Sequence, residues 1–375
     1  MALRNLIFLT VILLVLGAGC AYMAERSLAL SPVLARHPAL VRWTLGVMAG
    51  LLFAVPVLHR VPPLARWTGW MYWLSYGGFS FLSTYLPYLA AADLAQYLLG
   101  RFAGVRAGGW ACALAAGAAL VSVLLGVAAA LRPVATRRVQ VPMADLPAGL
   151  EGFRIVQISD LHLGPLVRRS QVEHILAATR ALRPDLIAVT GDLVDGTADG
   201  VGDQVERLGA LEATHGVCFV TGNHEYYSGV AHWLKVIKGM GWKVLDNEHV
   251  LLEHRGARLA VAGMPDPTAR RGPDLARALA GIPADAFPIL LFHPPTGAAA
   301  AARAGVRLQL SGHTHAGQYF PWSLLVPALF EHPRGLGRSA GMWIYTSVGT
   351  GFWGPPNRFL VPPELTLIVL AGGGA

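Results

Sequence analysis

Long apolar stretches dominate the first third of the chain. Four of them can be marked, at Leu6–Met23, Trp43–Leu58, Trp67–Leu89 and Trp110–Leu131. A bilayer core requires about 20 predominantly apolar residues per helix, and these stretches approach or exceed that length. Tryptophans near their ends suit the interface between membrane and water. The pattern therefore predicts a transmembrane helical domain of about four spans over residues 1–131.

The first stretch has a second possible interpretation. Arg4 precedes its apolar core, and small residues follow at Gly17 to Cys20, as in a secretion signal. A lipoprotein signal usually has Leu three residues before its cysteine, where this chain has Gly17. Because further apolar stretches follow, we favour an uncleaved membrane helix.

The arginines beside the spans bear on orientation. With four spans, the amino terminus and the second half of the chain lie on the same side of the membrane, and Arg137 and Arg138 directly precede that half. Positive charge is enriched on the cytoplasmic side of membrane proteins. The narrow excess of arginine on this side favours a multi-pass protein of the inner, cytoplasmic membrane whose second half is cytoplasmic.

Beyond residue 150 the apolar runs become short and rich in β-branched residues. Such runs, bounded by Gly, Asp or Asn, predict buried strands. They lie at Phe153–Ile158, Leu186–Thr190, Val217–Thr221, Ile289–Phe292 and Val306–Leu310. A helical pattern at Gln171–Leu182 separates the first two, which predicts a βαβ unit. We expect an α/β domain over residues 150–375, joined to the helices by a proline-containing linker at residues 132–149.

A polar cluster follows each of the five predicted strands. The clusters are Asp160-Leu-His162, Gly191-Asp192, Gly222-Asn223-His224, His293 and Gly312-His313-Thr-His315. Ligands gather at the carboxyl ends of strands in open α/β sheets, so these side chains are expected to converge. The metal-capable residues among them are Asp160, His162, Asp192, Asn223, His293, His313 and His315.

Together these residue types predict a site for two divalent ions. Two ions about 3.5 to 4 Å apart need a shared anionic ligand, for which Asp192 is the candidate. Asp160, His162 and His315 can hold one ion, and Asn223, His293 and His313 the other. A water bridging the two ions loses a proton easily and can attack phosphorus as hydroxide. Oxygen and imidazole ligands without thiolate suit Mn, Fe or Zn, and they leave the identity of the metal open.

Two further residues are candidates for catalysis. His224, beside the ligand Asn223, is placed to stabilise developing charge or to protonate the leaving oxygen. Asp195, in the run Gly191-Asp-Leu-Val-Asp195, could orient the imidazole of His224.

Composition agrees with a membrane domain joined to an enzyme domain. The chain is 54% hydrophobic and 14% charged, which is low in charge for a single soluble protein. Its net charge of +8 suits anionic lipid headgroups. Because no dense basic run is present, a nucleic-acid groove is not expected.

The five clusters resemble, in order, the motifs of the calcineurin-like metallophosphoesterase family. The resemblance covers about residues 150 to 370 and implies a four-layer αββα sandwich with a dinuclear metal centre. The runs Ser159–Gly164 and Pro362–Leu367 look closest to a bacterial, membrane-associated branch that includes lipid-precursor pyrophosphatases, such as UDP-diacylglucosamine hydrolases. One departure is Ala316, where that branch often has Gly.

Two apolar loops bear on the substrate. Phe320–Phe330 follows the last metal motif and could contact the bilayer or acyl chains, or could pack against the core of its own domain. Gly351–Arg358 carries Trp353 and Arg358, both predicted to bind substrate, with Arg358 pairing with a second phosphate.

We therefore expect a membrane-anchored phosphohydrolase that cleaves a phosphoester or pyrophosphate bond in an amphiphilic, lipid-linked substrate. The first alternative is a phosphodiesterase for soluble nucleotides or cyclic nucleotides, with the helices serving only as an anchor. The second is a membrane sensor with hydrolysis as its output, for which Asp93 at the edge of the third stretch is the main sequence support.

Overall fold

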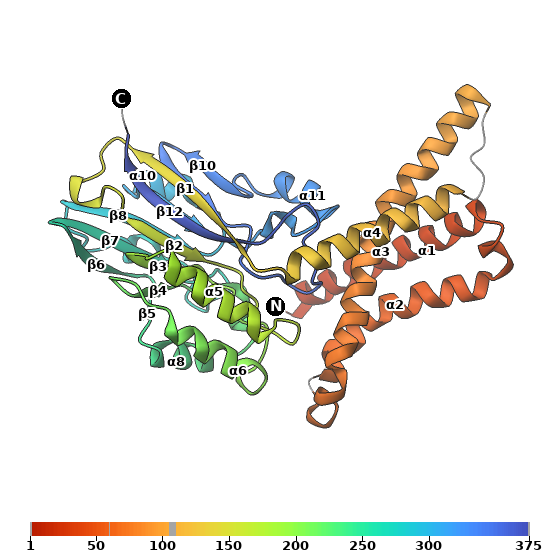
Figure 1. Cartoon of the computed structure of the whole chain (residues 1–375), viewed down its shortest axis with the longest axis horizontal. Helices are drawn as coiled ribbons and strands as arrows, with labels where there is room; N and C mark the ends of the chain where they lie inside the picture. Colours follow the sequence, from red (N-terminus) through yellow and green to blue (C-terminus); the bar gives the residue numbers. More distant parts are fainter. Residues whose placement is uncertain (1, 60, 105–109, 374–375) are drawn as a thin grey trace. The chain divides into compact units, whose positions relative to one another are not determined.

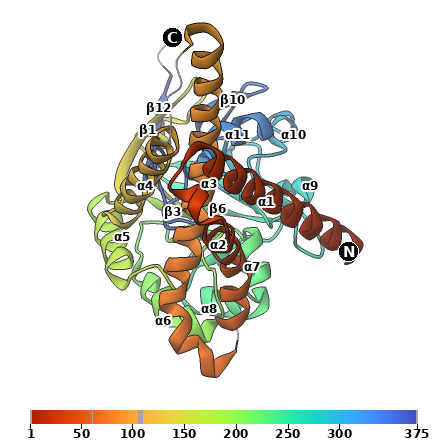
Figure 2. The ribbon, with the colours of Figure 1, turned by 90° about the vertical axis from the view of Figure 1, so that its right-hand side faces the viewer.

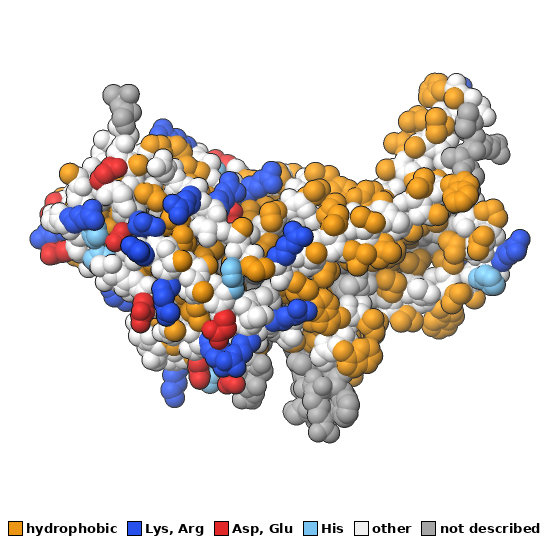
Figure 3. Space-filling view, viewed as in Figure 1, with side chains coloured by type: hydrophobic (Ala, Val, Ile, Leu, Met, Phe, Trp, Pro, Cys, Tyr) orange, Lys and Arg blue, Asp and Glu red, His pale blue; other side chains and the backbone are white. Residues whose placement is uncertain are grey.

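The computed structural model describes residues 2–59, 61–104 and 110–373, with side chains omitted at residues 2–9, 59, 62–68 and 198–200. The chain forms two compact units. The helical unit comprises residues 1–128 together with the segment 354–359, and the α/β unit comprises residues 129–353 and 360–375. Hydrophobic side chains cover much of the helical unit, whereas charged side chains are concentrated on the α/β unit (Figure 3).

Four long helices form most of the helical unit (Figure 2). They are α1 (Ala2–Leu30), α2 (Pro38–His59), α3 (Pro62–Ala103) and α4 (Trp110–Leu131). Three segments are long and apolar enough to cross a membrane, namely Thr10–Leu30, Pro38–Leu58 and Trp110–Leu131. These match three of the four predicted spans.

The remaining predicted span, Trp67–Leu89, lies within α3, and its start falls among the side chains that are not described. Over the residues whose side chains are described, α3 is not among the segments long and apolar enough to cross a membrane, so three of the four predicted spans are supported. Helix α3 carries polar side chains, and Ser75, Ser80 and Thr84 are buried within the unit. Ser75 Oγ, for example, donates a hydrogen bond to the Leu51 carbonyl oxygen at 3.0 Å.

The helices pack through an apolar cluster that includes Met23, Leu82, Leu89, Cys112 and Ala119. Buried small residues on α4 permit the close helix contact expected within membranes. Asp93 on α3 forms an ion pair with Arg26 and accepts a hydrogen bond from the Tyr22 hydroxyl at 3.3 Å.

The segment Gly354–Phe359 belongs to the helical unit although it lies far along the chain from the helices. Asn357 Nδ2 donates to Ser80 Oγ at 2.6 Å, and the Arg358 backbone N–H donates to the Gly126 carbonyl oxygen at 3.0 Å. A Cβ atom on Gly126 would overlap the Asn357 amide oxygen. Gly126 therefore provides the space in which this segment is held.

The α/β unit contains two six-stranded sheets (Figure 1). The first sheet has the strand order β1 (Ala135–Met143), β12 (Glu364–Gly372), β2 (Arg154–Ile158), β3 (Leu186–Val189), β4 (Val217–Phe219) and β5 (Lys243–Val244). The second has the order β10 (Gly335–Ser339), β11 (Met342–Thr346), β9 (Leu308–Ser311), β8 (Ala286–Phe292), β7 (Ala257–Met264) and β6 (Glu248–His254). The five predicted runs lie in β2, β3, β4, β8 and β9. Strands β2 and β3 are parallel and joined through α5 (Arg169–Ala181), which confirms the predicted βαβ unit.

Helices cover the outer face of each sheet (Figure 1). The first sheet is covered by α5, α6 (Ala198–Arg207) and α8 (Val230–Gly239), as Figure 1 shows. On the second sheet, α9 (Leu275–Leu279) and α10 (Ala298–Arg303) share an apolar cluster with its strands. Between the sheets, Ile155 and Ala188 of the first share one apolar cluster with Val261 and Leu291 of the second. Two shorter helices, α7 (Asn223–Tyr227) and α11 (Trp322–Leu329), lie beside the strand ends. The architecture is the expected αββα sandwich.

Residues 135–143, within the predicted linker at 132–149, instead form strand β1. It pairs in parallel with β12 from Ala135 opposite Glu364 to Met143 opposite Gly372. Only the end of this strand carries buried apolar residues, at Val141 and Met143. Its first half is exposed and rich in arginine, which explains why an apolar pattern did not reveal it.

Candidate metal centre

The seven predicted ligands all lie at the carboxyl ends of strands. Asp160 and His162 follow β2, Asp192 follows β3, Asn223 follows β4, His293 follows β8, and His313 and His315 follow β9. Both sheets therefore contribute, and the loops converge as the sequence predicts.

Asp160, His162 and His315 form the first ligand cluster. The Nε2 atoms of His162 and His315 are 2.9 Å apart, and His315 Nε2 is 3.4 Å from Asp160 Oδ1. These separations suit neighbouring ligands on one ion, since imidazole and carboxylate ligands bind at about 2.0 to 2.2 Å. The lone pairs converge as a cation requires.

Asp192, His293 and His313 form the second cluster. His293 Nε2 is 3.1 Å from Asp192 Oδ2 and 3.3 Å from His313 Nδ1. The side-chain oxygen of Asn223 lies 3.1 Å from His313 Nδ1, which adds a neutral ligand to this cluster. The same donor set fits a second ion.

Asp192 belongs to both neighbourhoods. Its Oδ2 atom, 3.1 Å from His293 Nε2, is also 3.8 Å from His162 Nε2 of the first cluster. A carboxylate in this position fits the shared ligand of a two-metal site.

Outer hydrogen bonds fix the orientation of the imidazoles. His293 Nδ1 donates to the Thr190 carbonyl oxygen at 2.7 Å, which leaves Nε2 as the metal-binding nitrogen. His162 Nδ1 is held in the same way by Asp195 Oδ1 at 2.9 Å. The oxygen that holds His162 is also 2.5 Å from His224 Nδ1. Asp195 thus orients two imidazoles at once.

The pairing of Asp195 with His224 shifts the pKa of both groups. Burial raises the pKa of Asp195, but His162 and His224 outweigh it and lower the value to about 2. Burial lowers the pKa of His224, but the hydrogen bond and charge of Asp195 raise it to about 9. The pair is therefore a carboxylate with an imidazolium at neutral pH.

Several ligand residues hold an uncommon backbone conformation. The φ angle is positive at Asp160 (53°), His162 (49°), Asp192 (51°), His313 (71°) and His315 (48°). Non-glycine residues in this region cost about 1 to 3 kcal/mol each, and they persist where the surrounding structure over-determines them. The sharp loops at the strand ends, rather than the strands themselves, orient these side chains towards the candidate metal centre.

Sequence reasoning missed the role of Glu225, which is fully buried. Its carboxylate accepts hydrogen bonds from the backbone N–H groups of Asp192 (3.1 Å), Leu193 (2.7 Å) and Gly222 (2.6 Å). Burial and the charge of Asp192 raise the pKa of Glu225 to about 7, against the opposing effect of the backbone hydrogen bonds. Its place in the run Gly222-Asn-His-Glu225 was the available signal.

Two glycines in the motifs are required by space. A Cβ atom on Gly222 would overlap the Asp192 carboxylate, and one on Gly312 would overlap Ser159 and Asp160. Ser159 Oγ itself donates to Asp160 Oδ2 at 2.5 Å. These glycines let two ligand loops approach each other.

The two predicted substrate-binding residues differ in their placement. Trp353 lies in the α/β unit, 55% exposed, with its ring centroid 5.9 Å from that of His224. Its backbone exchanges two hydrogen bonds with the Gln318 side chain, at 2.7 and 2.8 Å. Arg358 is instead fully buried and belongs to the helical unit. Trp353 therefore lies beside His224 of the ligand loops, whereas Arg358 is part of the other unit.

The apolar loop after the last motif forms helix α11. Among its described residues none is buried, and Leu324 and Leu329 are 67% and 75% exposed. Packing into the core of its own unit, one alternative for this loop, is thus not observed. The adjoining Phe330 ring lies 5.9 Å from the His313 ring, so α11 borders the metal centre.

The αββα fold and the two ligand clusters are the arrangement of a metal-dependent phosphoesterase domain. Residues 153–317 match the family model described as calcineurin-like phosphoesterase. An uncharacterized metallophosphoesterase of Aquifex aeolicus is 33% identical over 68% of this chain and 99% of its own length. The chain belongs to the calcineurin-like phosphoesterase family.

Other relatives connect this family to membranes. A zebrafish (Danio rerio) protein named transmembrane protein with metallophosphoesterase domain is 36% identical over 67% of this chain and 60% of its own length. A Bos taurus protein of the same name is also 36% identical, over 69% of this chain and 62% of its own length. The chain thus spans about three fifths of these two relatives. Together with three candidate spans, they support membrane association.

Proposed function

We propose that the protein binds two divalent ions and hydrolyses a phosphoester or pyrophosphate bond of an amphiphilic substrate at the membrane. The observation that carries the dinuclear site is the position of Asp192 Oδ2, within 3.1 Å of His293 Nε2 and 3.8 Å of His162 Nε2. Bound there, the ions would supply Lewis-acid activation of water and of the phosphoryl oxygens.

Protein groups around the ions supply orientation and a proton. Asp195 holds His162 and His224 through their Nδ1 atoms. The Nε2 atom of His224 is then the nitrogen left to donate a hydrogen bond to the leaving oxygen. Trp353, with its exposed ring beside His224, is placed to contact the substrate next to the scissile bond.

Metal content tests the dinuclear proposal. We expect elemental analysis of the purified full chain, loaded separately with Mn, Fe or Zn, to give two ions per chain. A single ion per chain at saturation would contradict the shared role of Asp192.

The amphiphilic substrate is supported by three features. The chain carries three helices long and apolar enough to cross a membrane, the exposed apolar helix α11 borders the metal centre, and the net charge is +8. The sequence resemblance to a bacterial branch containing lipid-precursor pyrophosphatases points the same way. Suitable substrates are nucleotide-activated acylated sugars, isoprenoid phosphates and phospholipids.

A substrate screen tests this choice. The metal-loaded full chain in detergent micelles is assayed against these amphiphiles and against their deacylated or soluble counterparts. We expect faster turnover of amphiphiles. Equal rates on soluble nucleotides or cyclic nucleotides would favour the phosphodiesterase alternative, in which the helices act only as an anchor.

Sidedness belongs to the same proposal. We place the protein in the inner membrane as a multi-pass protein with a cytoplasmic α/β unit, because Arg137 and Arg138 lie at the start of that unit, a few residues after the last candidate span ends at Leu131. A carboxyl-terminal fluorescent protein that matures only in the cytoplasm is expected to fluoresce, and a carboxyl-terminal fusion to a periplasm-dependent phosphatase is expected to be inactive. The opposite result would place the active site outside.

A further inference from the structure

A second cavity of the α/β unit, outside the metal centre, combines arginine with apolar side chains. It has a volume of about 520 Å³ and lies beside strands β1, β10 and β12. Its lining includes Arg137, Arg334, Leu336, Val348, Leu360 and Val361. None of these residues is a candidate metal ligand.

The charges of this cavity are not balanced. Among its described lining residues the single acid is Glu364, which is 5% exposed and pairs with Arg137 at 3.3 Å. The Glu364 carboxylate also accepts hydrogen bonds from the Tyr345 hydroxyl (2.6 Å) and the Val348 backbone N–H (3.3 Å). Its charge is therefore held inside the protein, while Arg137 remains more than half exposed.

The two arginines come from different sheets, since Arg137 lies on β1 of the first sheet and Arg334 directly precedes β10 of the second. Arg137 Nη2 lies 3.7 Å from the Cβ position of Gly335, the residue that follows Arg334. Two arginines that line the same cavity, opposed by one buried carboxylate, form a site for an anion. Guanidinium groups bind phosphate through paired hydrogen bonds.

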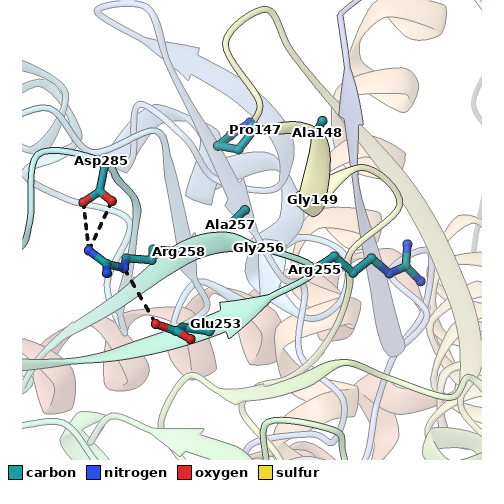
Figure 4. A pocket seen from close by; sticks show the side chains of 9 residues that line it. All are labelled: Pro147, Ala148, Gly149, Glu253, Arg255, Gly256, Ala257, Arg258 and Asp285. Carbon is teal, nitrogen blue, oxygen red and sulfur yellow. Dashed lines mark hydrogen bonds and ion pairs between the residues drawn. The ribbon is translucent and has the colours of Figure 1, made fainter.

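Another cavity of the same unit has a similar size and also contains two arginines, but it lacks the excess of positive charge. A cavity of about 580 Å³ lined by Arg255 and Arg258 also contains the acids Glu253 and Asp285 (Figure 4). There Arg258 pairs with Asp285 at 3.1 Å and with Glu253 at 3.8 Å. Two acids balance two arginines, and its apolar lining is limited to proline, alanine and glycine.

The cavity lined by Arg137 and Arg334 differs also in its apolar wall. Leu360 is 69% exposed at its edge, and Leu336 and Val361 extend the apolar surface inward. Val348 and Val361 pack against Ala316, which directly follows the candidate ligand His315. An amphiphile bound here would have its charged group on the arginines and its apolar part against the leucines, one side-chain layer from the metal loops.

We propose that this cavity binds the phosphate headgroup of an anionic phospholipid from the bilayer, as a site distinct from the metal centre. Arg137 and Arg334 bind the phosphate, and Leu336 and Leu360 contact the glycerol backbone and the upper part of the acyl chains. The lipid holds the α/β unit at the membrane surface independently of whether the hydrolysed substrate is itself a lipid.

The test measures binding of phosphatidylglycerol to the metal-loaded full chain in micelles of a neutral detergent, with phosphatidylcholine as the comparison lipid. Arg137→Gln combined with Arg334→Gln is expected to raise the dissociation constant for phosphatidylglycerol by at least about tenfold, since each arginine near an anionic lipid contributes about 1 kcal/mol. The matched control combines Arg255→Gln with Arg258→Gln and leaves the dissociation constant unchanged. Metal content and hydrolysis of a chromogenic soluble diester report that each variant is folded, and these are expected to stay as in the unaltered chain.

A second variant separates the lipid from a free phosphate ester and does not disturb Glu364. Leu360→Gln is expected to weaken phosphatidylglycerol binding and to leave the weaker binding of glycerol 3-phosphate unchanged. The proposal is overturned if the arginine variants bind phosphatidylglycerol as the unaltered chain does. It is overturned equally if phosphatidylcholine or glycerol 3-phosphate binds as tightly as phosphatidylglycerol.

Discussion

Individual ligand residues could be predicted because their spacing is tied to strand ends. Asp160, Asp192 and His313 each follow an apolar run, and parallel strands bring such positions to one edge. The role of Glu225 could not be predicted in the same way. Its partners are backbone N–H groups of a loop some thirty residues away, which leave no mark in the pattern of side chains.

Glu225 provides the sharpest test at this scale. Glu225→Gln exchanges one acceptor oxygen for an NH₂ group that faces backbone donors, so the loop carrying Asp192 loses its anchor. Outer-sphere partners of metal ligands typically affect metal affinity by 10- to 100-fold, and we expect a loss of about that size in a metal titration. The exposed Glu212→Gln change serves as the control. Unaltered metal affinity in Glu225→Gln would show that the loop holds its shape without the carboxylate.

The buried thiol of Cys218 is expected to make the free energy of unfolding depend on pH in the alkaline range. Burial raises the pKa of Cys218 from 9.0 to about 12, so the unfolded state loses this proton at lower pH than the folded state. The stabilisation is complete below about pH 9 and is lost as the pH rises towards 12. We expect the free energy of unfolding to fall more steeply between pH 8 and 10.5 in the unaltered chain than in Cys218→Ala, measured by denaturant titration. Parallel slopes would show that the thiol titrates equally in both states.

Among the secondary-structure elements, those with a continuous apolar pattern were predicted and those with a mixed pattern were not. Strands β2, β3 and β8 are buried on both faces and can therefore be recognised in the sequence as apolar runs. Strand β1 is exposed over its first half and lies within the segment that was predicted as a linker. Its position in the sheet is defined by pairing with β12 rather than by its own composition.

Helix α11 is predicted to select for amphiphilic substrates. Replacing Leu324, Leu325 and Leu329 together by Gln removes exposed apolar surface next to His313 without touching a ligand. We expect the rate on an amphiphilic substrate to fall by about tenfold or more, whereas the rate on a soluble chromogenic diester stays constant. The control is Leu251→Gln on β6, which also changes an exposed leucine. Equal losses on both substrates would mean that α11 supports the metal loops instead.

Gly126 on α4 tests the packing of the segment 354–359. Gly126→Ala places a methyl group on the Asn357 amide, whereas Gly117→Ala on the same helix meets no atom within 4 Å. We expect Gly126→Ala to destabilise the helical unit by about 1 to 3 kcal/mol, as overpacking does, and Gly117→Ala to be neutral or stabilising. Thermal unfolding in detergent distinguishes the two. Similar stability of both variants would indicate that the segment can shift at little cost.

For the whole molecule, the sequence predicts a helical part followed by an α/β part, and the chain forms a helical unit and an α/β unit. Long apolar helices and short β-branched strands differ in the period and length of their apolar pattern. The two parts of the chain can therefore be told apart even where the predicted bounds of an element are wrong. No feature of the sequence indicates that Arg358 belongs to the helical unit. Its segment, residues 354–359, lies between parts of the α/β unit along the chain and has no apolar pattern typical of a helix.

That segment makes the connectivity of the protein unusual. The chain passes between the two units three times, at residues 128–129, 353–354 and 359–360. Deletion of the helices therefore does not release a self-contained enzyme. It leaves the six residues 354–359 in place but removes their hydrogen-bonding partners, Ser80 and Gly126. A dissection of this protein into a soluble enzyme and an anchor requires a second cut and a replacement loop between Trp353 and Leu360. Because the chain passes between the units three times, neither unit can be exchanged for that of another protein by a single fusion joint.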